Sequence, residues 1–190
     1  MGSDPSSFLG FYATRFDTVE LNTTGYRLPS EEQFERWRDA TPTGFRFAVK
    51  LPLTRLDRVG TFVERVTVLR DRLGPLRIVV QQERDEGLLA FLLGSLDPDL
   101  SVAFDFRHPS WDQADVPVRV GSLEADARFR YVRYRKPPYG DEFFAAEAAR
   151  LRPVLDGGSS VYAYFPHEDE ATAPVYAERL RRELDEPRGR

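Results

Sequence analysis

Three apolar segments of this 190-residue chain carry charged side chains that a fully buried strand would not contain. Glu20 alternates with apolar residues in "TVELN", Lys50 ends "FRFAVK", and Asp105 lies within "VAFDF". Residues two apart on a strand share a face, so each segment has one apolar face and one face that becomes polar late. Carboxylates can serve as general acids or bases, and a lysine as an electrostatic stabiliser. We therefore predict Glu20, Asp105 and Lys50 as catalytic residues.

Further polar side chains lie at the ends of the same kinds of segment and define a predicted binding set. Its members are Asn22, Tyr26, Gln81, Arg107, Arg133, Arg135 and Tyr139. Lysine and arginine outnumber the acids in the combined site, although the whole chain has a net charge of -4. A cationic pocket in an acidic protein suits a small anionic or sugar-like ligand.

Structural alternatives stand beside these assignments. Glu20 could hold Arg133 or Arg135 in an ion pair, and Lys50 could be a strand end that meets solvent. Tyr26 and Tyr139 fit packing as well as they fit binding.

Strand-like and helical patterns alternate along the chain, which is typical of βαβ units and a parallel sheet. Strands are predicted near 18–22, 45–50, 77–82, 101–106, 129–135 and 160–165, with a weaker one at 117–123. Helices are predicted at about 6–15, 30–40, 58–73, 86–95, 141–155 and 171–184. Polar residues late on buried strands are typical of the mouth of a barrel. We therefore predict an α/β fold, namely an incomplete TIM-like barrel with about seven parallel strands. The barrel is predicted to be a single domain over residues 8–184, preceded by a flexible leader, 1–7, and followed by a loose tail, 185–190.

Composition argues against several classes of protein. No apolar run approaches the roughly 18 residues of a membrane span, and the net charge of -4 disfavours nucleic-acid binding. Without cysteine and with two histidines, the chain is predicted to hold no metal and no cofactor, and to be cytoplasmic. His108 is predicted to be a loop residue that caps a helix or bonds a carbonyl, and Ser110, two residues on, is not expected to form a catalytic triad with it. Trp37 and Trp111 are predicted to be core or packing residues.

Four segments, "FYATRFDTVELNTTGYRLPSEEQFERW", "TPTGFRFAVKLP", "FDFRHPSW" and "YVRYRKPPYG", together resemble the domain-of-unknown-function family 72, also called YecE-like. The resemblance covers roughly residues 8 to 183 and implies a TIM barrel related in shape to sugar-isomerase-like barrels, with no established activity. Asp105 replaces the family's usual glutamate, and Arg135 stands where the family has histidine.

The resemblance also implies a first strand with a "GTSGW"-like segment, which this divergent chain lacks. An open barrel edge would expose unpaired backbone groups, so a homodimer that covers the gap is a hypothesis. Two functions stay open at this point. One is an enzyme of hydrolase or isomerase type acting on a small anionic or sugar-like substrate. The other is a non-catalytic barrel that binds a ligand or a partner.

Overall fold

A computed structural model describes residues 5–25, 28–51, 53, 56–124, 127–166 and 172–186. The chain forms two compact units, Met1–Asp115 and Val116–Arg190. Both units are α/β, and every strand pair in them is parallel. The α/β class predicted from the sequence is confirmed, while the single domain over 8–184 stays a prediction.

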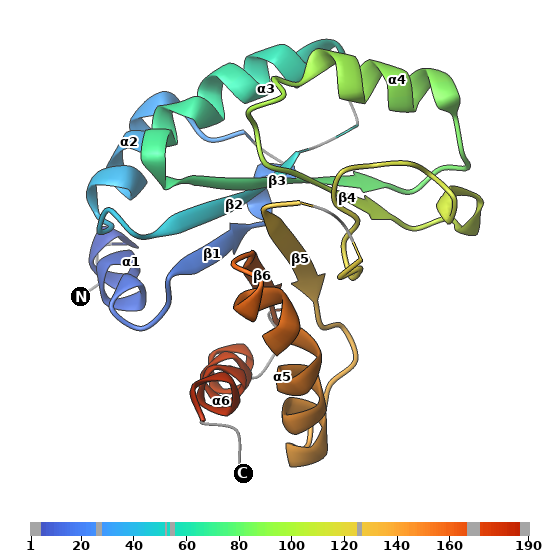
Figure 1. The fold of residues 1–190 in the computed structure, drawn as a ribbon. Helices are drawn as coiled ribbons and strands as arrows, with labels where there is room; N and C mark the ends of the chain where they lie inside the picture. The colour runs from blue at the N-terminus through green and yellow to red at the C-terminus, as the bar shows by residue number, and fades with distance from the viewer. Residues whose placement is uncertain are drawn as a thin grey trace. The chain divides into compact units, whose positions relative to one another are not determined.

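The first unit contains a four-stranded parallel sheet with the order β1-β2-β3-β4 (Figure 1). Its strands are β1 (Thr18–Leu21), β2 (Arg46–Leu51), β3 (Leu73–Val80) and β4 (Val102–Phe106). Its α-helices are α1 (Pro5–Ala13), α2 (Glu31–Asp39), α3 (Val59–Val66) and α4 (Glu86–Ser95). Short 3-10 turns lie at η1 (Thr23–Gly25), η2 (Leu56–Arg58), η3 (Thr67–Arg72) and η4 (Pro109–Trp111).

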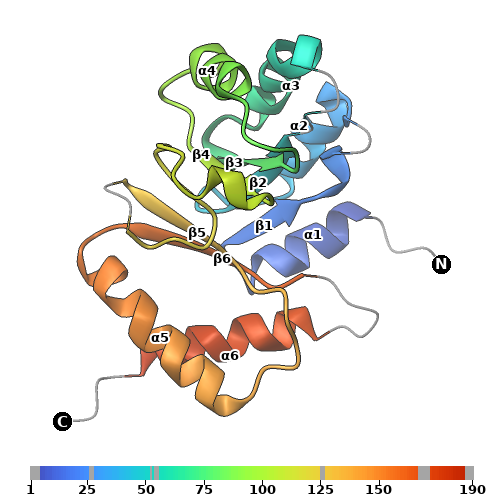
Figure 2. The same ribbon diagram turned by 90° about the vertical axis from the view of Figure 1, so that its right-hand side faces the viewer.

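One face of this sheet is apolar and lies under α2, α3 and α4, which share one side of it (Figure 2). Buried strand residues on this face, such as Phe47, Ile78 and Phe104, pack in a core with Phe62 and Leu92 of the helices. Local signals start two of these helices. Ser30 caps α2 and Asp85 caps α4.

The third strand begins earlier than the sequence predicts. The pattern at 77–82 suggested a strand after the "GP" at 74–75, yet β3 runs from Leu73 to Val80. The pairing register shifts between Phe47 and Val49, and a Cβ added to Gly74 would lie 3.1 Å from the Phe47 carbonyl oxygen. A bulge is one of the few places where a strand accepts proline. The early start puts Arg77 in the middle of a buried strand.

The second unit consists of two βα pairs. Its elements are β5 (Phe129–Arg133), α5 (Asp141–Asp156), β6 (Ser160–Tyr164) and α6 (Ala173–Asp185), and β5 pairs with β6. Its core contains Val132, Tyr134, Phe144, Leu151 and Leu180.

The prediction of a weaker strand at 117–123 is wrong. Within the described ranges that segment forms only an isolated bridge at Arg119, and the strands number six in two sheets instead of about seven. The segment "PVRVGSL" lacks the run of apolar residues that would let it pair along its length, and Gly121 takes a left-handed φ of 92° that ends the bridge.

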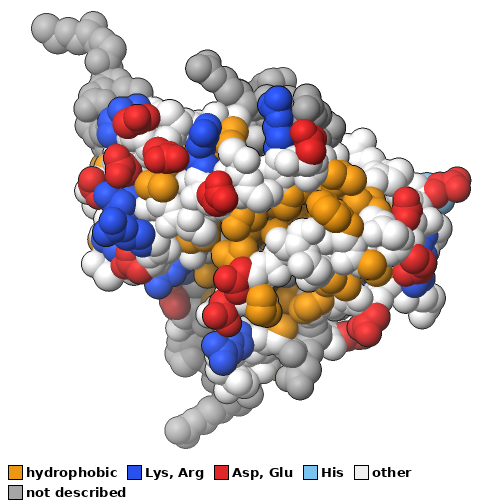
Figure 3. Space-filling model, turned by 90° about the horizontal axis from the view of Figure 1, so that it is seen from above, with side chains coloured by type: hydrophobic (Ala, Val, Ile, Leu, Met, Phe, Trp, Pro, Cys, Tyr) orange, Lys and Arg blue, Asp and Glu red, His pale blue; other side chains and the backbone are white. Residues whose placement is uncertain are grey.

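The outer side of the helical layer in the first unit is partly apolar. Phe91 and Leu93 on α4 are 41% and 45% exposed, and hydrophobic side chains gather in the middle of the face seen in Figure 3. No helix in the described part of the chain has both the length and the apolar character needed to cross a membrane.

Candidate functional site

The register of the four-stranded sheet places four charged side chains on one face, in addition to Arg46 at the start of β2. Lys50 pairs with Arg77, and Arg77 pairs with Ala103. Glu20 pairs with Ala48, two residues before Lys50, and Asp105 pairs with Val79, two residues after Arg77. Register partners point to the same side of a sheet, and so do residues two apart on one strand. Glu20, Lys50, Arg77 and Asp105 therefore share the face opposite the helices.

Arg77 is the centre of this polar face. Its Nη1 donates to Asp105 Oδ2 at 2.6 Å and its Nη2 donates to Asn22 Oδ1 at 2.8 Å. Its Nε lies 2.8 Å from Glu20 Oε1 in an ion pair that lacks the alignment of a hydrogen bond. The side chains of Arg77, Glu20 and Asp105 are 2%, 4% and 3% exposed. All three nitrogens of one buried guanidinium thus face acceptors from β1, β4 and the residue after β1.

A small residue makes room for this arrangement. Glu20 on β1 and Arg77 on β3 are separated by β2, and neighbouring strands lie about 4.8 Å apart. Ala48 is fully buried on β2 and is the register partner of Glu20. Because its side chain is only a methyl group, the long side chains of Glu20 and Arg77 can meet across β2.

The turn after β1 fixes the remaining acceptor. Asn22 Nδ2 donates to Glu20 Oε2 at 2.8 Å, so the amide bridges the carboxylate and the guanidinium. The buried Thr24 hydroxyl in η1 lies 2.9 Å from the Leu21 carbonyl oxygen and 2.8 Å from that of Lys50. These contacts tie the end of β1 to the end of β2 and hold the Asn22 amide in place.

Arg107 extends the network towards solvent. Its Nη2 donates to Asp105 Oδ2 at 3.1 Å, and its side chain is 37% exposed. Glu20 and Asp105 carry two negative charges, while Lys50, Arg77 and Arg107 carry three positive charges. These five side chains therefore have a formal excess of one positive charge.

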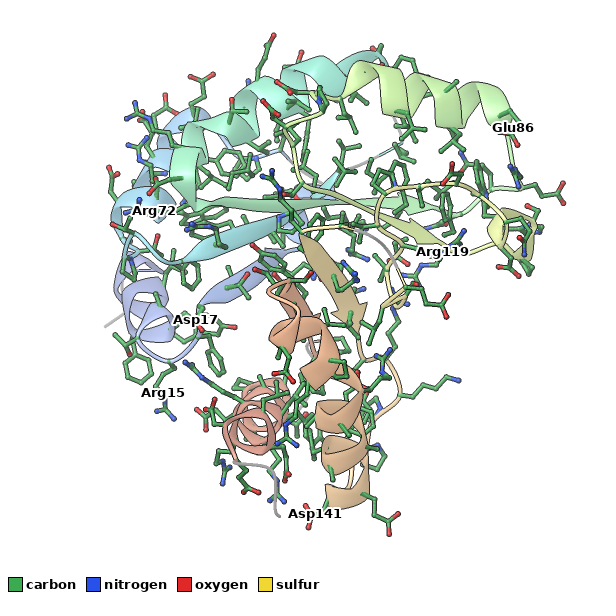
Figure 4. The ribbon with its side chains drawn as sticks, in the orientation of Figure 1. Arg15, Asp17, Arg72, Glu86, Arg119 and Asp141 are labelled. Carbon is green, nitrogen blue, oxygen red and sulfur yellow. The ribbon has the colours of Figure 1, made fainter. Side chains whose placement is uncertain are left out.

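The network lies towards the carboxyl-terminal edge of the sheet. In Figure 4, Arg72, which precedes β3, and Glu86, which begins α4 after β3, lie at opposite edges of the sheet. Asn22 and Arg107 directly follow β1 and β4. Ligands of parallel α/β sheets bind outside this edge.

Arg77 takes the place that a cation would take between two carboxylates. The described residues contain no group of three or more His, Cys, Asp or Glu side chains that could hold a metal ion. The prediction of no metal was made from composition and stays a prediction.

The loops after β3 and β4 are held together by Trp111. Its buried ring stacks on Phe106 with 4.6 Å between centroids, and its indole N–H donates to the Gln82 carbonyl at 2.8 Å. The predicted packing role of Trp111 is confirmed, as is that of Trp37, which packs between Phe34 and Phe47. Gln81, the first residue after β3, is exposed.

His108 begins the loop that Trp111 anchors, and it caps η4, which is one of the two roles predicted for it. Its Nδ1 accepts a hydrogen bond from the Ser110 backbone N–H at 3.3 Å. The Ser110 hydroxyl lies 2.8 Å from the same nitrogen, so these two sequence neighbours do make a side-chain contact.

Three predicted binding residues belong to the second unit. Arg133 ends β5 with Tyr164 as its register partner, and Arg135 is exposed. The Tyr139 ring packs 4.4 Å from that of Phe143, in the aromatic core of the unit, and its hydroxyl accepts from the Lys136 N–H at 2.8 Å. Their convergence with Glu20 stays a prediction.

Tyr26 and His167 lie outside the described residues. The guanidinium that the structure shows on Glu20 is that of Arg77, which the sequence analysis missed. Arg77 is the only charged residue between Leu73 and Val80, and a single charge inside an apolar run is the signal that could have found it.

Comparisons with known proteins place the chain in a family. A family model described as "Protein of unknown function DUF72" matches residues 2–123, which include Glu20, Arg77, Asp105 and Arg107. UPF0759 protein YecE of Escherichia coli strain K12 is 33% identical over 112 residues, or 53% of this chain and 41% of that protein. The YecE protein of Escherichia coli O157:H7 gives the same values. The chain thus matches less than half the length of these relatives.

Solved structures agree at the level of the fold. A crystal structure of a DUF72 family protein from Enterococcus faecalis V583 has a TM-score of 0.79 and 17% identity, and the match covers 96% of this chain and 95% of that one. A second crystal structure of that protein gives a TM-score of 0.72 at 16% identity, covering 95% and 89% of the two chains. With the family model matching more than half of its residues, this chain belongs to the DUF72 family of proteins of unknown function.

Proposed function

We propose that the polar face of the four-stranded sheet binds a small anionic or sugar-like molecule at the carboxyl-terminal ends of its strands. The observation that carries this proposal is the buried Arg77 guanidinium, held by Glu20, Asp105 and Asn22 on a face that other parallel sheets fill with apolar side chains.

Stability alone does not explain this network. Desolvating the charges of a buried ion pair offsets most of their attraction, and well-packed apolar side chains of similar volume are often as stable or more stable. A chain that retains Glu20, Arg77 and Asp105 at adjoining buried positions gains a set of charges in fixed positions. Fixed charges of this kind recognise ligands and stabilise charge that develops during a reaction.

Arg107 and Lys50 indicate the class of ligand. Asp105 orients the Arg107 guanidinium, which is 37% exposed, and Lys50 is the register neighbour of Arg77. A guanidinium matches the two oxygens of a carboxylate or a phosphate. The Asn22 amide next to them suits the hydroxyl groups of a sugar. A sugar phosphate or a sugar acid combines both features.

Binding is tested by isothermal titration calorimetry with inorganic phosphate and with glucose 6-phosphate. Arg107→Ala should weaken binding of the ligand by about tenfold or more, because it removes a charge-assisted hydrogen bond. Arg36→Ala on α2 is the matched control, since it removes the same charge from the helical layer. Equal affinities for the wild type and both variants, or no binding of either probe, would contradict the proposal.

We also propose catalytic roles for this site. Glu20 or Asp105 would act as the general acid or base and Lys50 as an electrostatic stabiliser, in a hydrolase or isomerase reaction. Glu20→Gln should abolish turnover of a sugar phosphate while phosphate binding persists. Glu20 also contacts Arg77, so the fold of this variant is checked first by its unfolding midpoint.

A second candidate function is binding without catalysis. One observation favours it: both candidate acid–base carboxylates are already engaged by Arg77. Wild-type protein that binds glucose 6-phosphate but neither isomerises nor hydrolyses it, or related sugar phosphates, would support this function over the enzymatic one.

The incomplete TIM-like barrel is the architecture proposed for such a site. Strands that pair in parallel and alternate with helices support it, and it requires β1 and β4, the edge strands of the four-stranded sheet, to gain partners. Slow amide hydrogen exchange along both edges would support closure. In that barrel Arg133 adds to the anion site, so Arg133→Ala should weaken phosphate binding without unfolding the protein. The homodimer and the cytoplasmic location stay predictions.

A further inference from the structure

A serine, a histidine and a glutamate meet in the two loops that follow β3 and β4. The Ser110 hydroxyl oxygen lies 2.8 Å from His108 Nδ1, and His108 Nε2 lies 3.8 Å from Glu83 Oε1. The side chains of His108 and Glu83 are 39% and 85% exposed. None of these three residues takes part in the Arg77 network.

The hydrogen bonds around His108 assign the position of its proton. The Ser110 backbone N–H donates to Nδ1, so the lone pair of Nδ1 faces Ser110. The backbone N–H of Arg84 donates to the Ser110 hydroxyl oxygen at 2.8 Å. With its oxygen accepting from Arg84, the hydroxyl can donate its own proton to Nδ1. A neutral His108 then carries its proton on Nε2, the nitrogen nearer Glu83.

This arrangement has the contacts of an activated nucleophile. A serine is activated when an adjacent base can take its proton and a third group orients that base. The usual roles of the two ring nitrogens are exchanged here, because Nδ1 faces the serine and Nε2 faces the acid. Trp111 holds the loop in place, since its buried indole N–H donates to the Gln82 carbonyl.

We propose that Ser110 is a nucleophile activated by His108, with Glu83 as a positioning residue, and that it attacks small carboxylic esters. Ser110 Oγ forms a bond to the ester carbonyl carbon while its proton passes to His108 Nδ1. The bond to the alcohol oxygen breaks, and the alcohol leaves with the proton from His108. Water then attacks the acyl-serine, its proton passes through His108 to Ser110 Oγ, and the carboxylic acid is released.

The structure sets the scale of the expected effect. The contacts around Ser110 supply base assistance, which is worth on the order of 10²- to 10⁴-fold in rate. The site is exposed, so it fits small and unhindered acyl groups. The proposal is independent of anion binding on the sheet, because Ser110 and His108 lie outside the Arg77 network.

Labelling by a fluorophosphonate tests the proposal directly on the full chain. The reagent forms a bond from Ser110 Oγ to phosphorus and releases fluoride, and mass spectrometry of peptides locates the adduct. Ser110→Ala should reduce labelling to background, whereas Ser95→Ala, which removes an exposed serine at the end of α4, should leave it unchanged. Hydrolysis of p-nitrophenyl acetate should likewise fall to background in Ser110→Ala and stay unchanged in Ser95→Ala.

The decisive variant is His108→Asn. Asparagine is a good cap, so it can still accept the Ser110 N–H, but it cannot take a proton from the hydroxyl. The labelling rate should fall by about 100-fold or more with an unchanged unfolding midpoint. Glu83→Gln should lower it by at most about fivefold, as expected for an exposed charge. Labelling of Ser110 that persists in His108→Asn, or wild-type protein that is not labelled, would overturn the proposal.

Discussion

The Arg77 network predicts a large and specific loss of stability in Arg77→Met. Methionine has a similar length and no charge, so the variant leaves the Glu20 and Asp105 carboxylates, 4% and 3% exposed, without their shared partner. Removing one member of a buried ion pair destabilises a protein by about 3–5 kcal/mol. Asp105 keeps Arg107 as a partner, which puts the expected loss at the lower end, about 3 kcal/mol. For a chain of this size that corresponds to a midpoint lower by roughly 6–12 °C.

Tryptophan fluorescence measures this loss of stability in the first structural unit, which contains Arg77. The chain has two tryptophans, Trp37 and Trp111, and both lie in the first unit. Their emission during urea unfolding therefore reports on the unit that contains Arg77. Arg84→Met is the control, because Arg84 pairs with Glu86 at 31% and 69% side-chain exposure. Exposed pairs of this kind contribute about 0–1 kcal/mol. An Arg77→Met variant no less stable than Arg84→Met would refute the assignment of a buried, interacting network.

Three further predictions follow from local contacts. Burial, and then the charge of Glu147, raise the pKa of the Tyr134 phenol above its ordinary value. The contribution of the Tyr134 phenol to stability is therefore complete below about pH 10 and is lost as the pH rises further. Unfolding followed by circular dichroism should show a smaller loss of stability at alkaline pH for Tyr134→Phe than for the wild type. The same variant should be less stable at neutral pH by about 1–3 kcal/mol. Gly74→Ala should destabilise the protein by about 1–3 kcal/mol in urea unfolding, because the added Cβ would lie 3.1 Å from a β2 carbonyl oxygen. Gly60→Ala is the control, since its Cβ would enter open space, and it should be neutral or stabilising in the same assay. Asp85→Ala should cost about 1 kcal/mol by loss of the α4 cap, and Asp85→Asn should restore it in the same assay.

Alternation along single strands was enough to predict that Glu20 and Asp105 share a polar face. Glu20 and Asp105 each occur between apolar neighbours, and a parallel sheet covered by helices on one side leaves only the other side for them. The packing of Trp111 was also predicted from the sequence, and capping was one of the two roles predicted for His108. These features depend on residues close together in the chain, where sequence patterns are most informative.

Arg77 was missed because its place inside a buried strand, and not at the start of one, depends on a bulge. Gly74 and Pro75 look like a turn that precedes a strand, and only the close approach of Gly74 to β2 shows that the strand has already begun. The contact between Ser110 and His108 depends likewise on backbone geometry, since it forms where the chain turns from His108 into η4. The prediction of a weak strand at 117–123 failed because the short alternating segment there has no partner strand to pair with along its length.

Stability and ligand recognition can be separated at the Arg77 network, because the two depend differently on its charges. Replacing Glu20, Arg77 and Asp105 together by leucine, methionine and leucine removes the buried charges and leaves no carboxylate unpaired. Such replacements are often neutral or stabilising, so this triple variant should recover much of the stability that Arg77→Met loses. Phosphate binding should not return, because the partner that orients Arg107 has gone. If complete removal of the charged network restores stability but not phosphate binding, the network serves ligand recognition. The stability of the sheet then comes from the apolar face beneath the helices.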